Sequence, residues 1–392
     1  MAMMKVSVGS AGRFHTFDLA RQLYRSGCLT TLYTGYPRWK VDGLPRDKVR
    51  TFPWVMGPVT VAARLGLHGL REWLNYWVVE SFDRWVASRL EPCEVYHCLS
   101  SFGVQSHRAA RERYGALTVC DRGSSHILYQ DEVLAEEHAR WGIPYRAIDR
   151  RLVDRELQEY EFCDRIFVPS SFVYRSFVQK GVPETKLVKI PYGVDLSLFR
   201  AVPKEDDVFR VIYVGALSLR KGIPDLLEAM CSLRLPRFEV WLIGSCLPEA
   251  RPFLRKWEGR YRYLGVIPRK DLYRYYSQGS LFVIASVEEG LALVQAQAMA
   301  CALPVIATTN TGAADLFTDG VEGFIVPIRD PAAIQEKVLY LYEHPEIREE
   351  MARAALRRVR SLGGWETYGS SIVTAYDEAL KARERSVAHP AL

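Results

Sequence analysis

Short apolar strands alternate with amphipathic helical segments along most of this chain, and this alternation limits the possible folds more than any other feature. Strand patterns occupy residues 5–8, 94–98, 117–120, 165–169, 187–190, 209–214, 239–243, 262–264, 281–285, 304–307 and 323–326. Helical patterns occupy residues 17–26, 148–162, 223–231, 269–278, 293–302 and 331–342. Strands and helices in turn predict parallel, doubly wound α/β sheets, whose ligands bind outside the carboxyl ends of the strands. We therefore expect functional residues in strand-to-helix loops.

Length and linker composition predict two domains. The chain has 392 residues, and single cores rarely grow beyond about 250–300 residues. A polar, charged stretch at residues 201–207 precedes a new strand that starts at Phe209. We expect an N-terminal Rossmann-like domain over residues 1–200 and a second over residues 205–365, facing each other across a cleft.

Composition bounds the protein class. The 48% hydrophobic and 25% charged residues are typical of a soluble globular protein. Eight cysteines without a C-x-x-C pair favour a reducing cytoplasm and indicate neither a zinc ribbon nor a disulfide framework. No apolar run reaches the roughly 18 residues that cross a bilayer, so we expect neither export nor membrane spanning.

The whole net charge of +6 falls in residues 1–200. A basic surface there could attract an anionic acceptor or the inner face of a membrane, which would make the protein peripheral. A solvated surface without a partner explains the charge as well. Nucleic acid is not favoured, because no Lys/Arg-rich run or binding motif occurs.

The sharpest chemical motif follows the strand at residues 281–285. Glu289 and Gly290 form a short turn that opens the helical pattern 293–302. Such a turn brings a carboxylate together with backbone N–H groups at a helix start, which suits a sugar attached to a phosphate. The motif points to an enzyme that uses a nucleotide sugar.

A second motif lies in the loop after the strand that ends at Gly215. Arg220, Lys221 and Gly222 place two cations beside a glycine at a helix entry, which can hold a diphosphate. A solvated basic turn is the alternative. Together with Glu289, however, these cations meet the main requirement for breaking a sugar–phosphate bond, because they can stabilise the charge on the departing diphosphate.

Residues 289–305 resemble the E-G-F-G-x-x-x-x-E-A-x-A-x-G-x-P-V signature of the family 4 retaining glycosyltransferases, which have the GT-B fold. Further segments match the family in order: 168–171, 190–199, 214–222 and 319–327. The resemblance covers residues 165–330 and is weaker across the first domain.

The resemblance implies a role for individual residues. Lys221 and Arg220 would contact the donor diphosphate, and Glu289 the hydroxyls of the donor sugar. The remaining donor-binding positions that it implies are Gly12, Gly215, Val266, Ile267, Gly290, Leu291, Ala292, Leu293 and Gln297. Among them, Val266 and Ile267 would meet the base, and Gly12 would let the backbone approach the phosphates.

The chain also departs from the family pattern. Gln297 replaces a glutamate that usually holds the ribose hydroxyls, and an amide keeps the hydrogen bonds without the charge. Ala216 stands where many relatives have arginine, which leaves Arg220 as the substitute cation.

In the first domain, Asp121 and His126 lie in the segment that follows the predicted strand 117–120, and either could face the reacting sugar. A structural role in the loop is the other interpretation of His126. His15 could face the acceptor or cap a helix, and His97 fits a satisfied histidine at a strand end.

Residues 70–85 are rich in tryptophan at helical spacing, with arginines nearby. Such a helix could lie at a membrane interface. Packing against the first sheet accounts for the same pattern.

We expect a retaining glycosyltransferase that moves a sugar from a nucleoside diphosphate donor to a hydroxyl acceptor, in glycan, polysaccharide or glycolipid synthesis, with no metal and no cofactor beyond the donor. A C-terminal helix over residues 365–385 would cross back onto the first domain, as in relatives. Two other classes stay open. One is a catalytically silent sugar-nucleotide-binding partner subunit. The other is a GT-B relative with inverting or phosphorylase chemistry, for which the sequence offers no assignable general base. The nucleotide, sugar, acceptor, linkage and oligomeric state are left open.

Overall fold

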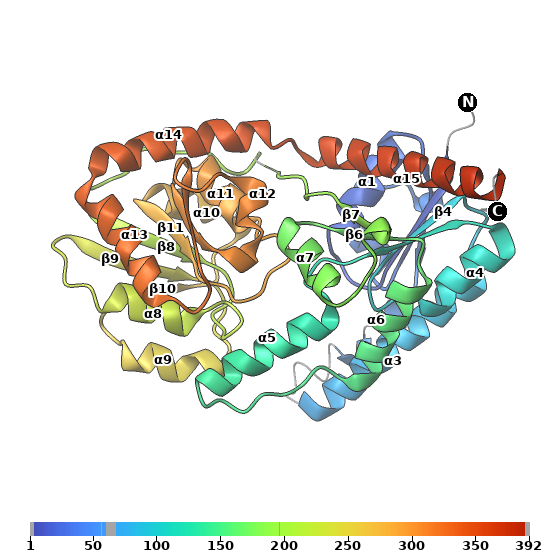
Figure 1. Cartoon of the computed structure of the whole chain (residues 1–392), viewed down its shortest axis with the longest axis horizontal. Coiled ribbons are helices and arrows are strands. Elements are labelled where there is room, and N and C mark those ends of the chain that lie inside the picture. Colours follow the sequence, from blue (N-terminus) through green and yellow to red (C-terminus); the bar gives the residue numbers. More distant parts are fainter. Residues whose placement is uncertain (1–3, 56, 60–67, 196, 389–392) are drawn as a thin grey trace.

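The computed structural model describes residues 4–55, 57–59, 68–195 and 197–388, and within them the chain forms two parallel sheets (Figure 1). The first sheet has seven strands in the order β3-β2-β1-β4-β5-β6-β7. Their bounds are Val6–Ser10 (β1), Leu29–Thr34 (β2), Val49–Thr51 (β3), Val95–Leu99 (β4), Leu117–Asp121 (β5), Arg165–Val168 (β6) and Leu187–Lys189 (β7).

The second sheet has six strands in the order β10-β9-β8-β11-β12-β13. Their bounds are Phe209–Val214 (β8), Phe238–Ile243 (β9), Arg262–Gly265 (β10), Leu281–Ile284 (β11), Val305–Thr308 (β12) and Gly323–Val326 (β13). The central strands β8 and β11 are buried along their whole length. Strands covered on both faces need mostly apolar residues, and only Arg210 of β8 interrupts the apolar pattern of these two segments, which makes them easy to recognise in the sequence.

Helices cover both faces of the first sheet. They are α1 (Thr16–Arg25), α3 (His68–Arg89), α4 (Val104–Tyr114), α5 (Ile127–Arg140), α6 (Arg150–Phe162), α7 (Ser171–Gln179) and α15 (Trp365–Ala388). Alternate residues of β1 such as Val6 and Val8 pack with α1 and α15, whereas Tyr96 of β4 packs with α3 and α4 on the other face. This alternation follows from the period of two in a strand.

The C-terminal helix α15 belongs spatially to the first sheet. In Figure 1, α14 and α15 run along the top of the molecule, and α15 reaches the blue N-terminal elements. There it packs against α1, and Tyr368, Ile372 and Tyr376 join the first core.

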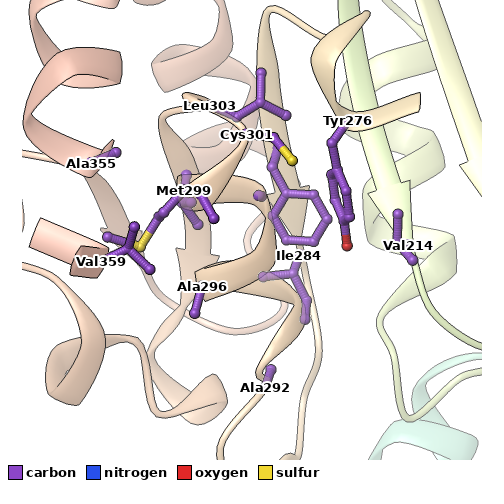
Figure 2. Packing of buried hydrophobic residues seen from close by; sticks show 14 of the residues in the cluster. Val214, Tyr276, Ile284, Ala292, Ala296, Met299, Cys301, Leu303, Ala355 and Val359 are labelled. Atoms are coloured by element: carbon purple, nitrogen blue, oxygen red, sulfur yellow. The ribbon is translucent and has the colours of Figure 1, made fainter. Parts of the chain in front are cut away.

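The helices of the second sheet are α8 (Ile223–Cys231), α9 (Arg251–Lys256), α10 (Leu272–Ser277), α11 (Val294–Ala300), α12 (Ala313–Leu316), α13 (Pro331–Glu343) and α14 (Pro345–Ser361). One of its two cores contains Ile284 of β11, Met299 of α11, and Ala355 and Val359 of α14 (Figure 2). Small residues such as Ala296 on α11 allow α14 to pack close to it. This packing fixes the start of α11, next to the Glu289 turn.

The prediction of two doubly wound parallel sheets is confirmed. Strands β2 and β3 were missed, because β2 carries three threonines among its six residues and β3 is a three-residue edge strand with an exposed Arg50. The predicted helix 269–278 is shorter in the structure: a 3-10 turn covers Arg269–Asp271 before α10.

The strand orders place two switch points. In the first sheet the chain moves outward from β1 to β2 and β3, and then returns to the other side of β1 with β4. The second sheet does the same between β8 and β11. Ligands of open α/β sheets bind at such points, so the loops after β1, β8 and β11 are the expected site walls.

Candidate active site

A cleft of about 640 Å³ lies at the carboxyl ends of both sheets. The first sheet contributes the β1–α1 loop, and the second contributes the loops after β8 and β11. Lining residues include Arg13, His15, Tyr192, Gly193, Gly215, Ala216, Lys221, Arg269, Glu289, Leu291, Ala292, Leu293, Gln297 and Trp365. The cleft is therefore lined by the loops that follow the strands at the two switch points.

Lys221 and Glu289 form an ion pair on the wall contributed by the second sheet. Their side chains are 22% and 12% exposed, and the Ser286 hydroxyl donates to Glu289 Oε1 at 3.3 Å. Burial and the neighbouring Arg220 cation lower the pKa of Lys221 to about 7, and the Glu288 carboxylate opposes this shift. The Glu289 carboxylate in contact with the amine favours its charged form. The pair offers an ammonium to an anion and a carboxylate to hydroxyl groups.

Arg220 lies beside this pair but is held by Glu288. Its guanidinium is 2.8 Å from Glu288 Oε2, and its Nε donates to the Glu288 carbonyl at 3.2 Å. Glu288 is fully buried and also accepts from the Ser125 amide at 3.0 Å, the Ser125 hydroxyl at 2.8 Å and the Gln130 side chain at 3.1 Å. Burial would raise the pKa of Glu288, but Arg220 and Ser125 outweigh it and lower that pKa.

Glu288 is thus a bridge between the two domains that the sequence interpretation missed. Its neighbour Glu289 carries the motif, and nothing in the local pattern tells which of two adjacent glutamates faces the cleft. A second bridge joins Arg140 of α5 to the buried Asp225 of α8 through two hydrogen bonds of 2.7 Å. Together these contacts hold the cleft walls in a fixed relation.

Gly290 lies where the two domains touch. A Cβ atom added there would lie 1.7 Å from the carbonyl oxygen of Gly123 in the first domain. The Gly290 carbonyl accepts from the Ser170 hydroxyl at 2.6 Å. Only a residue without a side chain allows the turn to approach the first domain this closely.

The residues after Gly290 line the cleft. Leu291, Ala292 and Leu293 form its floor next to the start of α11. The Ala292 amide donates to the Thr311 carbonyl at 3.1 Å, so that amide already has a partner within the protein. Gln297, one turn into α11, also lines the cleft, and its Oε1 accepts from the Tyr276 hydroxyl at 3.4 Å.

Of the other predicted positions, Gly215 lines the cleft, whereas Gly12, Val266 and Ile267 are not among its lining residues. Gly12 is in the β1–α1 loop, where its carbonyl accepts from the Ser10 hydroxyl at 2.9 Å. Val266 is 72% exposed, and Ile267 lines a second hollow of about 830 Å³ on the second domain.

His126 is buried and does not line the cleft within the described residues. Its Nδ1 accepts from the Leu128 amide at 3.2 Å and so caps α5. The ring packs against Tyr160 and Phe177 at centroid distances of 5.0 Å each. Burial, followed by the Arg122 and Lys180 cations, lowers the pKa of His126 to about 4. The imidazole is therefore neutral at pH 7.

His15 does reach the cleft, although it occupies the N-cap position of α1. Its side chain makes no capping hydrogen bond. Instead, Nε2 lies 2.5 Å from Asp121 Oδ2 at the end of β5, and the ring packs against Tyr192 in a tilted arrangement, with 4.2 Å between centroids. Tyr192 lies in the segment 190–199, which resembles the family pattern. That resemblance is the sequence feature that could have indicated its place in the site.

No helix among the described residues is long and apolar enough to cross a membrane. The tryptophan-rich stretch lies on α3, where Trp73 is 55% and Trp77 38% exposed, while Val78 and Phe82 pack into the first domain. The side chains at positions 70–72 lie outside the described part. In the same described part, no three His, Cys, Asp or Glu side chains are arranged to hold a metal ion.

Two family models match the chain. The model described as Glycosyltransferase Family 4 matches residues 13–198, and the one described as Glycosyl transferases group 1 matches residues 208–344. Together they cover most of the sequence: the first spans β2 to β7, and the second spans β8 to β13.

Relatives and solved structures agree with the family models. The D-inositol 3-phosphate glycosyltransferase of Kribbella flavida is 29% identical over 224 residues, which are 51% of this chain and 52% of that protein. The capsular polysaccharide biosynthesis glycosyltransferase CapM of Staphylococcus aureus is 28% identical over 186 residues, 46% of this chain and 48% of CapM. The chain thus spans about half the length of the curated relatives it matches.

The fold is shared with glycosyltransferase structures over nearly the whole chain. Sucrose-phosphate synthase from Thermosynechococcus elongatus superimposes with a TM-score of 0.68 at 20% identity, covering 97% of this chain and 100% of that one. Anabaena HepE, in complex with UDP and glucose, gives a TM-score of 0.66 at 16% identity over 95% of this chain and 99% of that one. The paired sheets, the motif order and both family models lead to one conclusion: the chain belongs to the family 4 glycosyltransferases, which have the GT-B fold.

Proposed function

We propose that the protein transfers a sugar from a nucleoside diphosphate sugar to a hydroxyl acceptor, with retention of the anomeric configuration. The observation that carries the proposal is the Lys221–Glu289 pair on the cleft wall. It supplies the two groups that such a donor needs, a cation for the diphosphate and a carboxylate for the sugar hydroxyls.

In the proposed reaction the acceptor oxygen attacks the anomeric carbon from the face that the diphosphate leaves. The bond from that carbon to the phosphate oxygen breaks with its electron pair on the diphosphate. The proton of the acceptor hydroxyl passes to the departing phosphate. Lys221 stabilises the charge that develops there. Arg220 lies in the adjacent loop position, where its pairing with Glu288 offsets part of its charge. In this proposal the cations of the protein itself, rather than a metal ion or a cofactor, meet the leaving group.

The two domains would divide the substrates. The donor would bind to residues 205–365, which contribute Lys221, Glu289 and the floor of the cleft. The acceptor would bind to residues 1–200, with the β1–α1 loop as its wall. The structures of HepE contain UDP, UDP-glucose or UDP with glucose, so uridine diphosphate sugars are the first donors to test.

The acceptor would belong to a polysaccharide, a glycan or a lipid-linked sugar. CapM acts in capsular polysaccharide biosynthesis, and the basic residues of the chain gather in its first 200 positions. Trp39 and Trp54 are each 82% exposed, and Trp73 is 55% exposed, all in the first domain. Tryptophan beside basic residues favours a peripheral contact with an anionic membrane. Sedimentation with phosphatidylglycerol vesicles, and release of the protein by 0.5 M salt, which is about three times the physiological ionic strength, would test that contact.

A thermal-shift screen of nucleoside diphosphates and their sugars tests the donor. A ligand at 100 times its dissociation constant stabilises the fold by about 2.7 kcal/mol. The Lys221→Ala variant should lose that stabilisation and keep its melting temperature without ligand near the wild-type value. If no nucleotide sugar stabilises the wild type, the proposal fails.

Product stereochemistry tests the route. Proton NMR of the anomeric product signal should show the configuration of the donor, and an inverted centre would refute retention. A protein that binds the donor but turns over none, even in cell extract supplying acceptors, would instead be the silent partner subunit.

A further inference from the structure

A buried chain of hydrogen bonds runs from the C-terminal helix to the cleft. The Tyr376 hydroxyl of α15 is 2.8 Å from Nδ1 of His97 on β4. His97 Nε2 is 3.0 Å from Asp121 Oδ2, and the same oxygen is 2.5 Å from Nε2 of His15. Tyr376, His97 and Asp121 are buried, and His15 alone reaches the cleft. Residues far apart in the sequence therefore converge on one carboxylate.

The chemistry of these partners limits where the protons can lie. Burial would raise the pKa of the Asp121 carboxyl, but the His15 and His97 rings beside it outweigh burial and hold that pKa well below its usual range. An ionised carboxylate can only accept hydrogen bonds, so both Nε2 atoms must carry a hydrogen. Burial keeps Tyr376 protonated, since its pKa is raised. A protonated hydroxyl can donate to His97 Nδ1, and this arrangement corresponds to the Nε2–H tautomer of His97.

His15 is left with one ring nitrogen to offer. Nε2 is bonded to Asp121, and the contact with the Tyr192 ring, 4.2 Å between centroids, restricts rotation of the His15 ring. Within the described part of the chain, Nδ1 has no hydrogen-bond partner, and the side chain does not cap α1. In the neutral Nε2–H tautomer, Nδ1 is a hydrogen-bond acceptor at the edge of the cleft.

We propose that His15 is a substrate-binding residue whose Nδ1 accepts a hydrogen bond from an acceptor hydroxyl other than the reacting one, and that Asp121 is the positioning residue that fixes its tautomer. The proposal rests on the proposed sugar transfer, because it assigns an acceptor contact to the first-domain wall. Lys221 and Glu289 hold the donor on the wall of the second domain, so the two substrates are recognised by different domains.

The tautomer can be tested on the whole protein without any substrate. Long-range ¹H–¹⁵N spectra of the full chain, assigned with His15→Ala and His97→Gln variants, report which ring nitrogen carries the hydrogen. The expected result is an Nε2–H signal and an unprotonated Nδ1 for both rings at pH 8. An Nδ1–H tautomer of His15 would overturn the proposal, whatever donor the protein uses.

Kinetics test the substrate contact, with free glucose and inositol as acceptor probes and hydrolysis of the donor as the second readout. His15→Ala should raise KM for the acceptor about tenfold, the usual effect of one lost hydrogen bond. Its donor KM and its rate of donor hydrolysis should stay within about twofold of wild type, while His344→Ala, on the second domain, should change neither. An equal loss in donor hydrolysis would overturn the assignment.

The Asp121 variants separate positioning from folding. Asp121→Ala removes the oxygen that both rings share, so it should raise the acceptor KM as much as His15→Ala does. Asp121→Asn keeps an oxygen that can accept from both rings and should restore the acceptor KM to within about threefold of wild type. If the asparagine variant is as impaired as the alanine variant while both melt near the wild-type temperature, Asp121 does not act through orientation. Failure of donor hydrolysis in the wild type would count against the proposed function alone.

Discussion

Substitution of Glu289 by glutamine should separate recognition of the donor sugar from recognition of its diphosphate. In the structure, Glu289 accepts from Lys221 and, at 3.3 Å, from the Ser286 hydroxyl. A donor diphosphate would draw the Lys221 ammonium away from this carboxylate. Glutamine keeps the shape and one acceptor oxygen but removes the charge that competes for Lys221.

The size of the effect follows from the burial of the pair. Because the two side chains are only 22% and 12% exposed, water screens their hydrogen bonds weakly, and bonds to charged groups there contribute about 1.5–3 kcal/mol each. Sugar hydroxyls that lose a charged acceptor should cost the donor about tenfold to a hundredfold in affinity. The bare nucleoside diphosphate makes no such contact, so its affinity should stay unchanged or rise by up to about tenfold.

Isothermal titration calorimetry of the nucleoside diphosphate and of its sugar, with wild type and Glu289→Gln, measures this ratio directly. Glu336→Gln is a matched control, because Glu336 also pairs with a lysine, Lys337 at 2.7 Å, but is 69% exposed. If the affinities for the bare diphosphate and for the sugar-bearing donor fall equally, Glu289 does not bind the sugar.

Three further outcomes follow from the fold. His126 is neutral in the folded protein, since burial and nearby cations lower its pKa to about 4, against 6.5 in the unfolded chain. The contribution of the neutral ring to the stability of the fold is therefore complete above pH 6.5, and it falls by about 2 kcal/mol at pH 5. Denaturant titrations should therefore show a shallower loss between pH 7.5 and 5 for His126→Asn, and parallel pH profiles would contradict this. Gly290→Ala would place a Cβ 1.7 Å from the Gly123 carbonyl oxygen, so donor turnover should fall more than tenfold and the radius of gyration from X-ray scattering should rise. Gly57→Ala is the control and should change neither, because its Cβ would meet nothing within 4 Å. Met299→Ala should cost about 2–5 kcal/mol in unfolding free energy, because Met299 of α11 is fully buried in the core that it shares with Ala355 and Val359 of α14 (Figure 2). A loss below about 1 kcal/mol would show that the core collapses around the cavity.

Local sequence patterns were sufficient for the architecture and for the second wall of the site. The buried strands β8 and β11 are apolar except for Arg210, and the loops that follow them carry Lys221 and Glu289 within a few residues of the strand ends. Because the carboxyl ends of parallel strands meet at one edge, the sequence predicts that these two loops lie near each other. The direct ion pair between Lys221 and Glu289 is seen only in the tertiary structure. The edge strands β2 and β3 were less predictable, since short, threonine-rich or half-exposed strands lack that apolar signal.

The remaining parts of the site depend on contacts between residues distant in sequence. Glu288 and Glu289 are adjacent, and only the position of Ser125 in the first domain decides that Glu288 faces the interface and Glu289 the cleft. His15 looked as suited to a helix cap as to a binding site, and the Asp121 carboxylate, 106 positions away, turns its ring toward the cleft. Sequence periodicity reports which face of a strand or helix is buried. It does not report which hydrogen-bond partner a polar side chain finds there, because that partner is chosen when the two sheets and α15 pack together.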